Sequence, residues 1–245
     1  LSTIFNTRCV RGNSLQADLS PHLLHRTEKA MTGSVYFISG IDTGIGKTYA
    51  TGYLAKLWNE QGKKTITQKL IQTGNVDISE DIEQHREIMA MGWFPEDETK
   101  LTMPEIFSYP ASPHLATKID DREIDFQKIE QATQQLAEKY DVVLLEGAGG
   151  LMVPLTIDLL TIDYVAEEKY PVILVTSGRL GSINHTLLSL EALKSRGLEL
   201  YALAYNLNDE SQDKLISKDT AEYLKGYLAK HFPRSLWLDI PVLVR

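Results

Sequence analysis

The run Val35–Ser39 (VYFIS), followed at once by Gly40–Thr48 (GIDTGIGKT), decides how this chain folds. The first part is a short apolar run typical of a buried strand. The second part matches the phosphate-binding pattern G-x-x-x-x-G-K-[ST], and the amphipathic sequence after it predicts a helix. In that setting, backbone N–H groups and the positive end of the helix point at phosphate oxygens. We therefore predict a nucleoside triphosphate site, with a chance glycine-rich turn as the alternative.

The rest of the chain alternates short apolar runs with longer amphipathic stretches, a pattern typical of βα units around a parallel sheet. The runs are continuously apolar, as expected for strands that are covered on both faces. The pattern predicts strands at Val35–Ser39, Lys64–Gln68, Asp141–Glu146, Val172–Thr176 and Leu200–Tyr205. It predicts helices at Thr48–Gln61, Ile82–Met91, Phe126–Tyr140, Ile183–Arg196 and Lys214–His231. We predict an α/β fold of three layers, a mostly parallel sheet with helices on both faces, in the P-loop NTPase architecture.

Glycine and proline indicate where these elements end. Gly62, Gly92 and Gly197 lie just past three predicted helices and are expected to end them. Pro104–Pro113 (PEIFSYPASP) carries three of the nine prolines, which excludes a helix interior or a central strand. We predict a loop there, either a plain surface connection or a loop over a site.

Charge and cysteine content exclude several classes of protein. The 245 residues include 25 Lys and Arg against 33 Asp and Glu, a formal net charge of −8. A broad basic surface for nucleic acid is therefore not expected. The single cysteine, Cys9, excludes a disulfide within the chain and a cysteine-based zinc site, and it fits a reducing compartment. No run approaches the ~20 apolar residues of a membrane span. We expect a cytoplasmic protein that binds neither nucleic acid nor a membrane.

Residues 1–30 differ from the patterned sequence that begins at Met31. They contain no strand-like run, and arginine is set against few acids: Arg8, Arg11 and Arg26 against Asp18 and Glu28. A transit peptide is one interpretation, but the apolar residues lack a clear helical spacing. We favour an upstream translated or expression-derived segment that is not part of the fold, followed by a single domain over 31–245.

The phosphate pattern supplies the first candidate functional residues. Lys47 is expected to reach the β- and γ-phosphates, and Thr48 to offer its hydroxyl to Mg²⁺. Glu146 ends a buried apolar strand and precedes Gly147–Gly150 (GAGG), which we predict to be a second flexible turn near the phosphates. Because a buried carboxylate without a partner is costly, we interpret Glu146 as a magnesium ligand. The alternative is an ordinary glutamate that faces solvent at a strand end.

Two further candidates are less specific as isolated residues. Lys69 follows the second predicted strand, where a second cation would stabilise charge on a transferred phosphoryl group. An ordinary surface lysine is the alternative. Asp81 belongs to an acidic cluster typical of a solvated helix start, and the pattern alone does not select it.

Seven motifs in this order resemble the dethiobiotin synthetase family, from about Val35 to Pro241. They are GIDTGIGKT at 40–48, Lys69 with Thr73-Gly74, Ser112-Pro113-His114, EGAGG at 146–150, LGSINH at 180–185, Asn206, and Ala221-Glu222-Tyr223. The chain departs from the family at Gly44, where a longer residue is usual, and at Leu70-Ile71, where Pro-Val is usual. Thr73 replaces the usual serine and keeps the hydroxyl.

The resemblance implies a ligase that uses ATP and Mg²⁺ and acts in biotin biosynthesis. Its substrates would be 7,8-diaminopelargonate, CO₂ (or bicarbonate) and ATP, and its product dethiobiotin. One amine takes up CO₂ as a carbamate, the carbamate attacks the γ-phosphate, and the second amine displaces phosphate to close the ureido ring. The family also implies a homodimer with the substrate site at the interface. No nucleophilic side chain is required.

The resemblance also implies a role for each matched residue. Lys47 and Lys69 would be catalytic, and Thr48, Asp81 and Glu146 would hold Mg²⁺. The substrate would be bound by Thr43, Thr73, Gly181, Ser182, Ile183, Asn184 and Tyr223. ATP would be bound by Gly44, Ile45, Gly46, Lys47, Thr48, Tyr49, Asp81, Glu146, Gly147, Ala148, Gly149, Asn206, Leu207 and Pro241. Asn206 would bond adenine, because Leu207 stands where a guanine-binding pattern N-K-x-D has lysine.

Two other classes share the phosphate pattern. A regulatory switch ATPase of the deviant P-loop group carries a lysine directly after the first glycine, where this chain has Ile41. An amidation ligase related to the cobyrinate enzymes carries a glutamine-hydrolysing domain with a catalytic cysteine, and no cysteine follows Cys9. A paralogous ligase with another substrate stays open.

Overall fold

The structure, a computed structural model, describes residues 33–208 and 213–242. All of these residues lie in one compact unit, Met31–Arg245. The segment predicted over residues 1–30, with Cys9, lies outside the described residues.

The main sheet has six strands, all parallel, in the order β2-β5-β1-β6-β7-β8. They are β1 (Ser34–Gly40), β2 (Thr65–Lys69), β5 (Val142–Gly150), β6 (Val172–Ser177), β7 (Leu200–Asn206) and β8 (Leu236–Ile240). The five predicted strands are confirmed. Because every strand runs the same way, the carboxyl ends of β1, β2 and β5 meet at one edge of the sheet, where ligands bind in open α/β folds.

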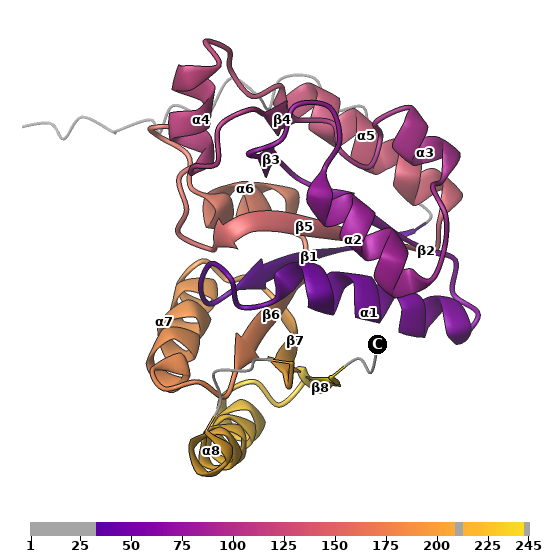
Figure 1. Cartoon of the computed structure of the whole chain (residues 1–245). Coiled ribbons are helices and arrows are strands. Elements are labelled where there is room, and N and C mark those ends of the chain that lie inside the picture. Colours follow the sequence, from indigo (N-terminus) through magenta and orange to yellow (C-terminus); the bar gives the residue numbers. More distant parts are fainter. Residues whose placement is uncertain (1–32, 209–212, 243–245) are drawn as a thin grey trace, which may run out of the picture. The chain divides into compact units, whose positions relative to one another are not determined.

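Helices cover both faces of this sheet (Figure 1). They are α1 (Lys47–Glu60), α2 (Glu80–Met89), α3 (Pro95–Glu98), α4 (Pro113–Ile119), α5 (Phe126–Lys139), α6 (Thr161–Glu168), α7 (Ser182–Ser195) and α8 (Lys214–His231). Buried residues of α5, α6, α7 and α8 form one apolar cluster with one face of the sheet, and α1 with the end of α2 forms the other. The three-layer α/β architecture is confirmed.

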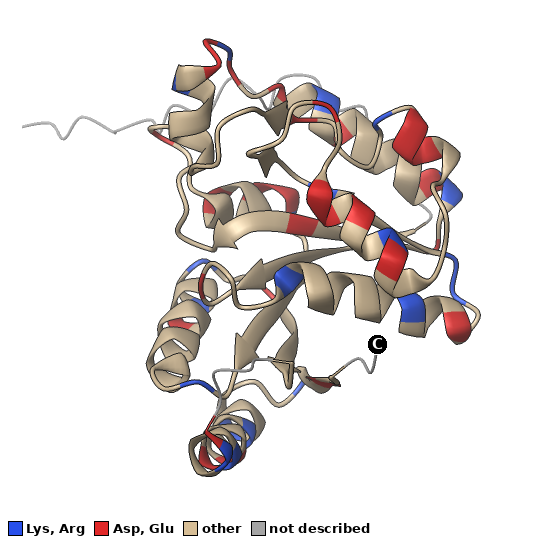
Figure 2. Ribbon diagram, viewed as in Figure 1, with Lys and Arg blue, Asp and Glu red and all other residues tan. Residues whose placement is uncertain are grey.

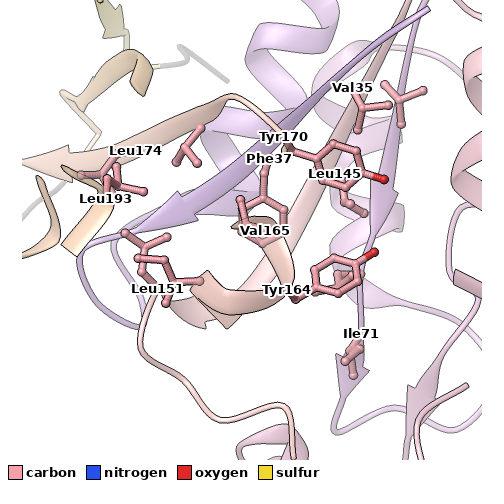
Figure 3. Packing of buried hydrophobic residues seen from close by; sticks show 14 of the residues in the cluster. Val35, Phe37, Ile71, Leu145, Leu151, Tyr164, Val165, Tyr170, Leu174 and Leu193 are labelled. Atoms are coloured by element: carbon pink, nitrogen blue, oxygen red, sulfur yellow. The ribbon is translucent and has the colours of Figure 1, made fainter. Parts of the chain in front are cut away.

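Side chains of successive strand residues alternate between the two clusters. Val35 and Phe37 of β1 lie on the side of α5–α8, in contact with Leu145 and Val165 (Figure 3), whereas Ile38 packs on the side of α1. The period of two in a strand explains this alternation. Both faces are apolar because both are covered, and the strand sequences are therefore continuously apolar.

Several elements were not predicted, and two local predictions are wrong. The sequence pattern did not predict strand β8 or helices α3, α4 and α6, because these elements are short or only partly buried. Helix α2 ends at Met89 with Ala90 in the left-handed conformation at φ 54°, so Gly92 does not end it. Residues 147–150 are not a flexible turn but part of β5, because Gly150 pairs with Gly40 after a register shift.

The proline-rich segment is not only a loop. Its residues Ile106–Phe107 form β4, which pairs in parallel with β3 (Gln72–Thr73) in a separate two-stranded sheet. Backbone bonds from Gln72 N–H to Glu105 O (2.8 Å) and from Gly74 N–H to Phe107 O (2.9 Å) connect segments more than 30 residues apart. No local pattern in either segment predicts this pairing.

Charged residues are distributed unevenly over the fold. Acidic residues gather along α2 and α3, shown in red in Figure 2. Within the described ranges, none of the helices combines the length and the apolar character that a membrane crossing requires.

Candidate active site

The phosphate loop lies between β1 and α1, as predicted. Gly46 caps α1 at φ +92°, a conformation that favours glycine. A Cβ on Gly46 would also lie 2.3 Å from Asn206 Nδ2. Asn206, at the end of β7, donates from Nδ2 to the carbonyl of Ile45 at 3.0 Å. Asn206 therefore holds the loop at the point where α1 begins.

Lys69 and Glu146 occupy paired positions on β2 and β5. Lys69 Nζ lies 2.8 Å from Glu146 Oε1 and 2.5 Å from Asp81 Oδ2, and it donates to the carbonyl of Gly147 at 3.3 Å. Asp81 lies in the first turn of α2. One buried ammonium group thus lies between two carboxylates that come from a strand and a helix.

Thr48 completes this group of oxygen atoms. Its hydroxyl lies 2.7 Å from Asp81 Oδ1 and 3.2 Å from Glu146 Oε1. One hydroxyl and two carboxylates are oxygen ligands of the kind that Mg²⁺ takes in company with phosphates and waters. Among the described residues, no group of three or more His, Cys, Asp or Glu is arranged to hold a metal. The three side chains fit a magnesium ion that receives its remaining ligands from a nucleotide.

Burial and charge act against each other on these groups. Burial opposes ionisation of Glu146, but Lys69 and the hydrogen bond from His85 outweigh it and hold the Glu146 pKa well below its usual range. Burial likewise opposes charge on Lys69, and Glu146 and Asp81 outweigh it, so the Lys69 pKa is raised. The site therefore keeps Lys69 and Glu146 charged.

Lys47 differs from Lys69. It is the first residue of α1 and only 8% exposed, and burial is the main cause that lowers its pKa. Nearby Glu146 raises the Lys47 pKa and Lys69 lowers it. Among the described residues, the ion pairs with the site carboxylates belong to Lys69 and His85 and not to Lys47. Lys47 is a buried cation whose charge an incoming phosphate can neutralise.

A pocket of about 430 Å³ adjoins the phosphate loop. It brings together residues from four separate motifs of the sequence and from the end of the proline-rich segment. Its lining consists of Thr43, Thr73, Pro110, Ala111, Ser112, Pro113, Ala148, Gly149 and Val153. Both threonines that the family resemblance assigns to the substrate line this pocket. The end of the proline-rich segment therefore lines this pocket, and a loop over a site stays a prediction.

The start of α7 forms a second region of interest. Gly181 precedes α7 at φ +94°, and the hydroxyl of Ser182 is buried without a hydrogen-bond partner among the described residues. Arg179 NH2 lies 2.8 Å from Asp42 Oδ2, which connects this region to the phosphate loop. Ile183 and Asn184 lie in the first turn of α7, and Asn184 is exposed. Tyr223 lies on α8 and is half exposed.

The residues assigned to the base of ATP lie at the ends of β7 and β8. Tyr49 donates its hydroxyl to the carbonyl of Pro241 at 2.9 Å, and Leu207 N–H donates to Ile240 O at 2.9 Å. Asn206 Oδ1 accepts from Asn208 N–H at 2.9 Å. Both amide atoms of Asn206 thus already have partners within the chain, which the sequence did not indicate.

The remaining predicted ATP-binding residues lie along the phosphate loop and β5. Gly44 is exposed at φ +69°, and Ile45 is buried in the cluster under α1. Gly147 offers its carbonyl to Lys69. Ala148 and Gly149 line the pocket.

Sequence reasoning missed His85. It lies on α2 four residues after Asp81, is fully buried, and its Nε2 is 2.9 Å from Glu146 Oε2. The spacing of four residues on a predicted helix was the available signal, since such residues share one face.

Comparison with known proteins places the chain among its relatives. A family model described as an AAA domain (AAA_26) matches residues 34–241. ATP-dependent dethiobiotin synthetase BioD 2 of Pasteurella multocida is 53% identical over 83% of this chain and 95% of its own length. The corresponding BioD protein of Chlorobaculum tepidum is 50% identical over 85% and 87%. Among solved structures, chloroplast FtsY of Physcomitrella patens aligns over 83% of this chain and 57% of that chain, with 16% identity and a TM-score of 0.48.

Proposed function

This chain belongs to the ATP-dependent dethiobiotin synthetases, ligases of biotin biosynthesis, and we propose that its pocket beside the phosphate loop binds 7,8-diaminopelargonate. The observation that carries this proposal is the convergence of Thr43, Thr73 and Ala148-Gly149 on one pocket. These residues come from three motifs far apart in the sequence, and they adjoin the loop that is built to hold a triphosphate. The two reactants would therefore meet at this edge of the sheet.

The reaction needs positioning and charge stabilisation more than a nucleophilic side chain. One amine of the substrate takes up CO₂ and loses a proton to form a carbamate. A carbamate oxygen then attacks the γ-phosphorus of ATP, and ADP leaves. The second amine attacks the carbonyl carbon of the resulting anhydride, phosphate leaves, and the ureido ring closes. Carbamate and triphosphate repel each other, so the site must neutralise both while it holds them in line.

We assign that neutralisation to the two lysines. Within the described part of the chain, no site carboxylate forms an ion pair with Lys47, and this supports its role at the β- and γ-phosphates. Lys69 lies at the end of β2, just before Thr73 of the pocket, and this supports its role between the carbamate and the transferred phosphoryl group. A positive charge held at that point stabilises negative charge as it develops in the transition state.

We propose that Thr48, Asp81 and Glu146 hold Mg²⁺ once a nucleotide is bound. Their three oxygen donors and the 2.7 Å and 3.2 Å distances from the Thr48 hydroxyl support this assignment. The ion supplies electrostatic stabilisation of the phosphate oxygens. Lys69 pairs with both of these carboxylates in the structure, and we propose that it turns toward the reactants when the ion binds.

We propose that the carboxylate of the diamine binds at the start of α7, across the interface of a homodimer. Backbone N–H groups at a helix start favour an anion, and the hydroxyl of Ser182, which has no partner among the described residues, adds a donor. Gly181, Ile183 and Asn184 would complete this site, with Tyr223 contributed from α8. Leu180 and Leu188 are exposed by 84% and 62% in this region, which supports burial against a second copy of the chain.

We propose that adenine lies between the end of β7 and the residues after β8. The side-chain amide of Asn206 lies where β7 ends beside the phosphate loop, and its bonds to Ile45 O and Asn208 N–H fix its orientation, which supports this placement. The rest of the nucleotide would be surrounded by Gly44, Ile45, Gly46, Gly147, Tyr49, Leu207 and Pro241.

We further propose that the ligase is a single domain over 31–245. We propose that it acts in the cytoplasm, where the single cysteine of the chain, Cys9, stays reduced.

The test is phosphate release from ATP with Mg²⁺ and bicarbonate, measured with and without 7,8-diaminopelargonate. We expect release that depends on the diamine, together with a ring-closed product detected by mass. Hydrolysis that does not depend on the diamine would contradict the assignment of the pocket and favour a switch ATPase. Binding of nucleotide without turnover of the diamine would indicate a paralogous ligase with another substrate.

A further inference from the structure

His85 is a fully buried histidine next to the proposed magnesium ligands. Its Nε2 lies 2.9 Å from Glu146 Oε2, on the opposite side of that carboxylate from Thr48 and Lys69, which both contact Oε1. The two oxygens of Glu146 therefore have different partners. His85 bonds Oε2, and Oε1 contacts the hydroxyl of Thr48 and the ammonium group of Lys69.

A chain of hydrogen bonds fixes the ring of His85 from its other side. His85 Nδ1 lies 3.0 Å from Thr67 Oγ1, which accepts from Arg86 NH1 at 2.8 Å. Arginine can only donate, so the Thr67 hydroxyl keeps its own hydrogen for Nδ1 of the imidazole. With that bond made, Nε2 carries the ring hydrogen and donates to Glu146. In this series of hydrogen bonds, each group thus donates to the next, from Arg86 through Thr67 and His85 to Glu146.

The series of hydrogen bonds continues from Arg86 to Asp97 of α3. Arg86 donates from Nε and NH2 to the two oxygens of Asp97, at 2.8 Å and 2.7 Å. Asp97 also accepts from the Thr102 hydroxyl at 2.6 Å. The bidentate pair is buried, which gives the ring of His85 a rigid support on α2, β2 and α3.

Helix α2 carries both Asp81 and His85, four residues apart on one face. We propose that His85 is a positioning residue that orients Glu146, so that α2 sets the geometry of both carboxylates of the magnesium site. Helix α2 positions Asp81 directly, because it carries this residue, and it positions Glu146 indirectly, through the hydrogen bond from His85. This inference rests on the proposed magnesium site. A hydrogen bond from a neighbouring residue typically changes metal affinity by about 10- to 100-fold.

Two substitutions separate the two nitrogen atoms of the ring. In His85→Gln the side-chain amide can reach the place of Nε2 and donate to Glu146. In His85→Asn the shorter amide can reach only the place of Nδ1, beside Thr67. His85→Gln therefore keeps a donor to Glu146. His85→Asn loses this donor but still places a side-chain amide in the same surroundings.

The experiment titrates Mn²⁺ into the complex of full-length enzyme with ADP and follows free Mn²⁺ by electron paramagnetic resonance. We expect His85→Asn to bind Mn²⁺ about 10- to 100-fold more weakly than the wild type, and His85→Gln to stay within about threefold. Affinity for ADP in the presence of EDTA should be unchanged in both, which shows that the phosphate loop is intact.

Equal Mn²⁺ affinity in His85→Asn and the wild type would overturn the inference, and so would an equal loss in both variants. If His85→Asn does not fold, Thr67→Val replaces it, because it keeps the imidazole and removes the hydroxyl that orients it. Wild-type affinity in Thr67→Val would then overturn the inference. If ADP does not promote Mn²⁺ binding in the wild type, the proposed magnesium site itself is wrong, whatever His85 does.

Discussion

Lys69 and Glu146 lie opposite each other on neighbouring parallel strands, and the ammonium group of one is 2.8 Å from a carboxylate oxygen of the other. Both side chains are almost completely buried. Such a pair contributes to folding only if the attraction outweighs the loss of water, and removal of one partner leaves an uncompensated charge. Its position beside the phosphate loop supports the catalytic role that we propose for Lys69.

The first prediction concerns Lys69. Lys69→Met should lower the rate of dethiobiotin formation by at least about 10²-fold, because it removes a charge that stabilises the transition state. Binding of ADP, measured by calorimetry, should persist, since Lys47 and the loop are unchanged. Lys64→Met serves as the control, because Lys64 is exposed just before the amino end of the same strand. Wild-type turnover in Lys69→Met would show that this charge plays no part in the reaction.

The second prediction concerns Lys47. Among the residues that the structure describes, no site carboxylate forms an ion pair with its buried charge, and burial lowers its pKa. Lys47→Met should therefore leave the melting temperature of the nucleotide-free protein unchanged or raise it. The rise in melting temperature that ATP or ADP causes in the wild type should be lost, because the phosphates lose their cation. A shift on nucleotide addition equal to that of the wild type would contradict the role of Lys47.

The third prediction concerns Ser182. A hydrogen bond to a charged group contributes about 1.5–3 kcal/mol, so Ser182→Ala should raise the KM for the diamine by about 10- to 100-fold. The KM for ATP should not change. Removal of a buried hydroxyl that bonds to none of the residues described by the structure should also leave the melting temperature intact. Ser189→Ala, on an exposed part of α7, is the control. An unchanged KM for the diamine would place its carboxylate elsewhere.

The fourth prediction concerns pH and the support of His85. Burial opposes ionisation of Asp97, but Arg86 outweighs it and lowers the Asp97 pKa below its usual range. In acid the unfolded chain therefore binds a proton that the folded chain does not, and stability falls as the pH drops. The contribution of Asp97 is present above about pH 4, the unfolded pKa, and is lost as the pH falls through the lower folded value.

Urea unfolding of the wild type and Asp97→Asn measures this contribution. Asp97→Asn should be less stable at pH 7 by about 3–5 kcal/mol, because Arg86 loses its buried partner. The difference between the two proteins should shrink between about pH 4 and pH 3. Asp77→Asn, which alters an exposed ion pair with Lys100, should show almost no difference at any pH. A gap that stays constant down to pH 3 would mean that folding does not lower the Asp97 pKa.

Local sequence determined the phosphate loop and the strands. A glycine-rich pattern between an apolar run and an amphipathic stretch leaves few conformations open, and a run that is apolar at every position requires cover on both faces. Lys47, Thr48 and Glu146 could thus be selected as candidates, because each stands next to such a pattern. Their order along the chain also carried the resemblance to the family.

Only the tertiary structure decided which polar side chains meet. Asp81 is one of several acids in its cluster, and the spacing of His85 from Asp81 does not say what either residue faces. Packing of α2 against the sheet brings Asp81 to Thr48 and Lys69, and His85 to Glu146. The pairing of β3 with β4 joins distant segments by backbone bonds and holds Thr73 of the pocket beside the proline-rich segment. Such contacts depend on the register of whole elements across the fold, and that register is set by burial and hydrogen bonding in three dimensions. Neighbours in sequence do not encode it.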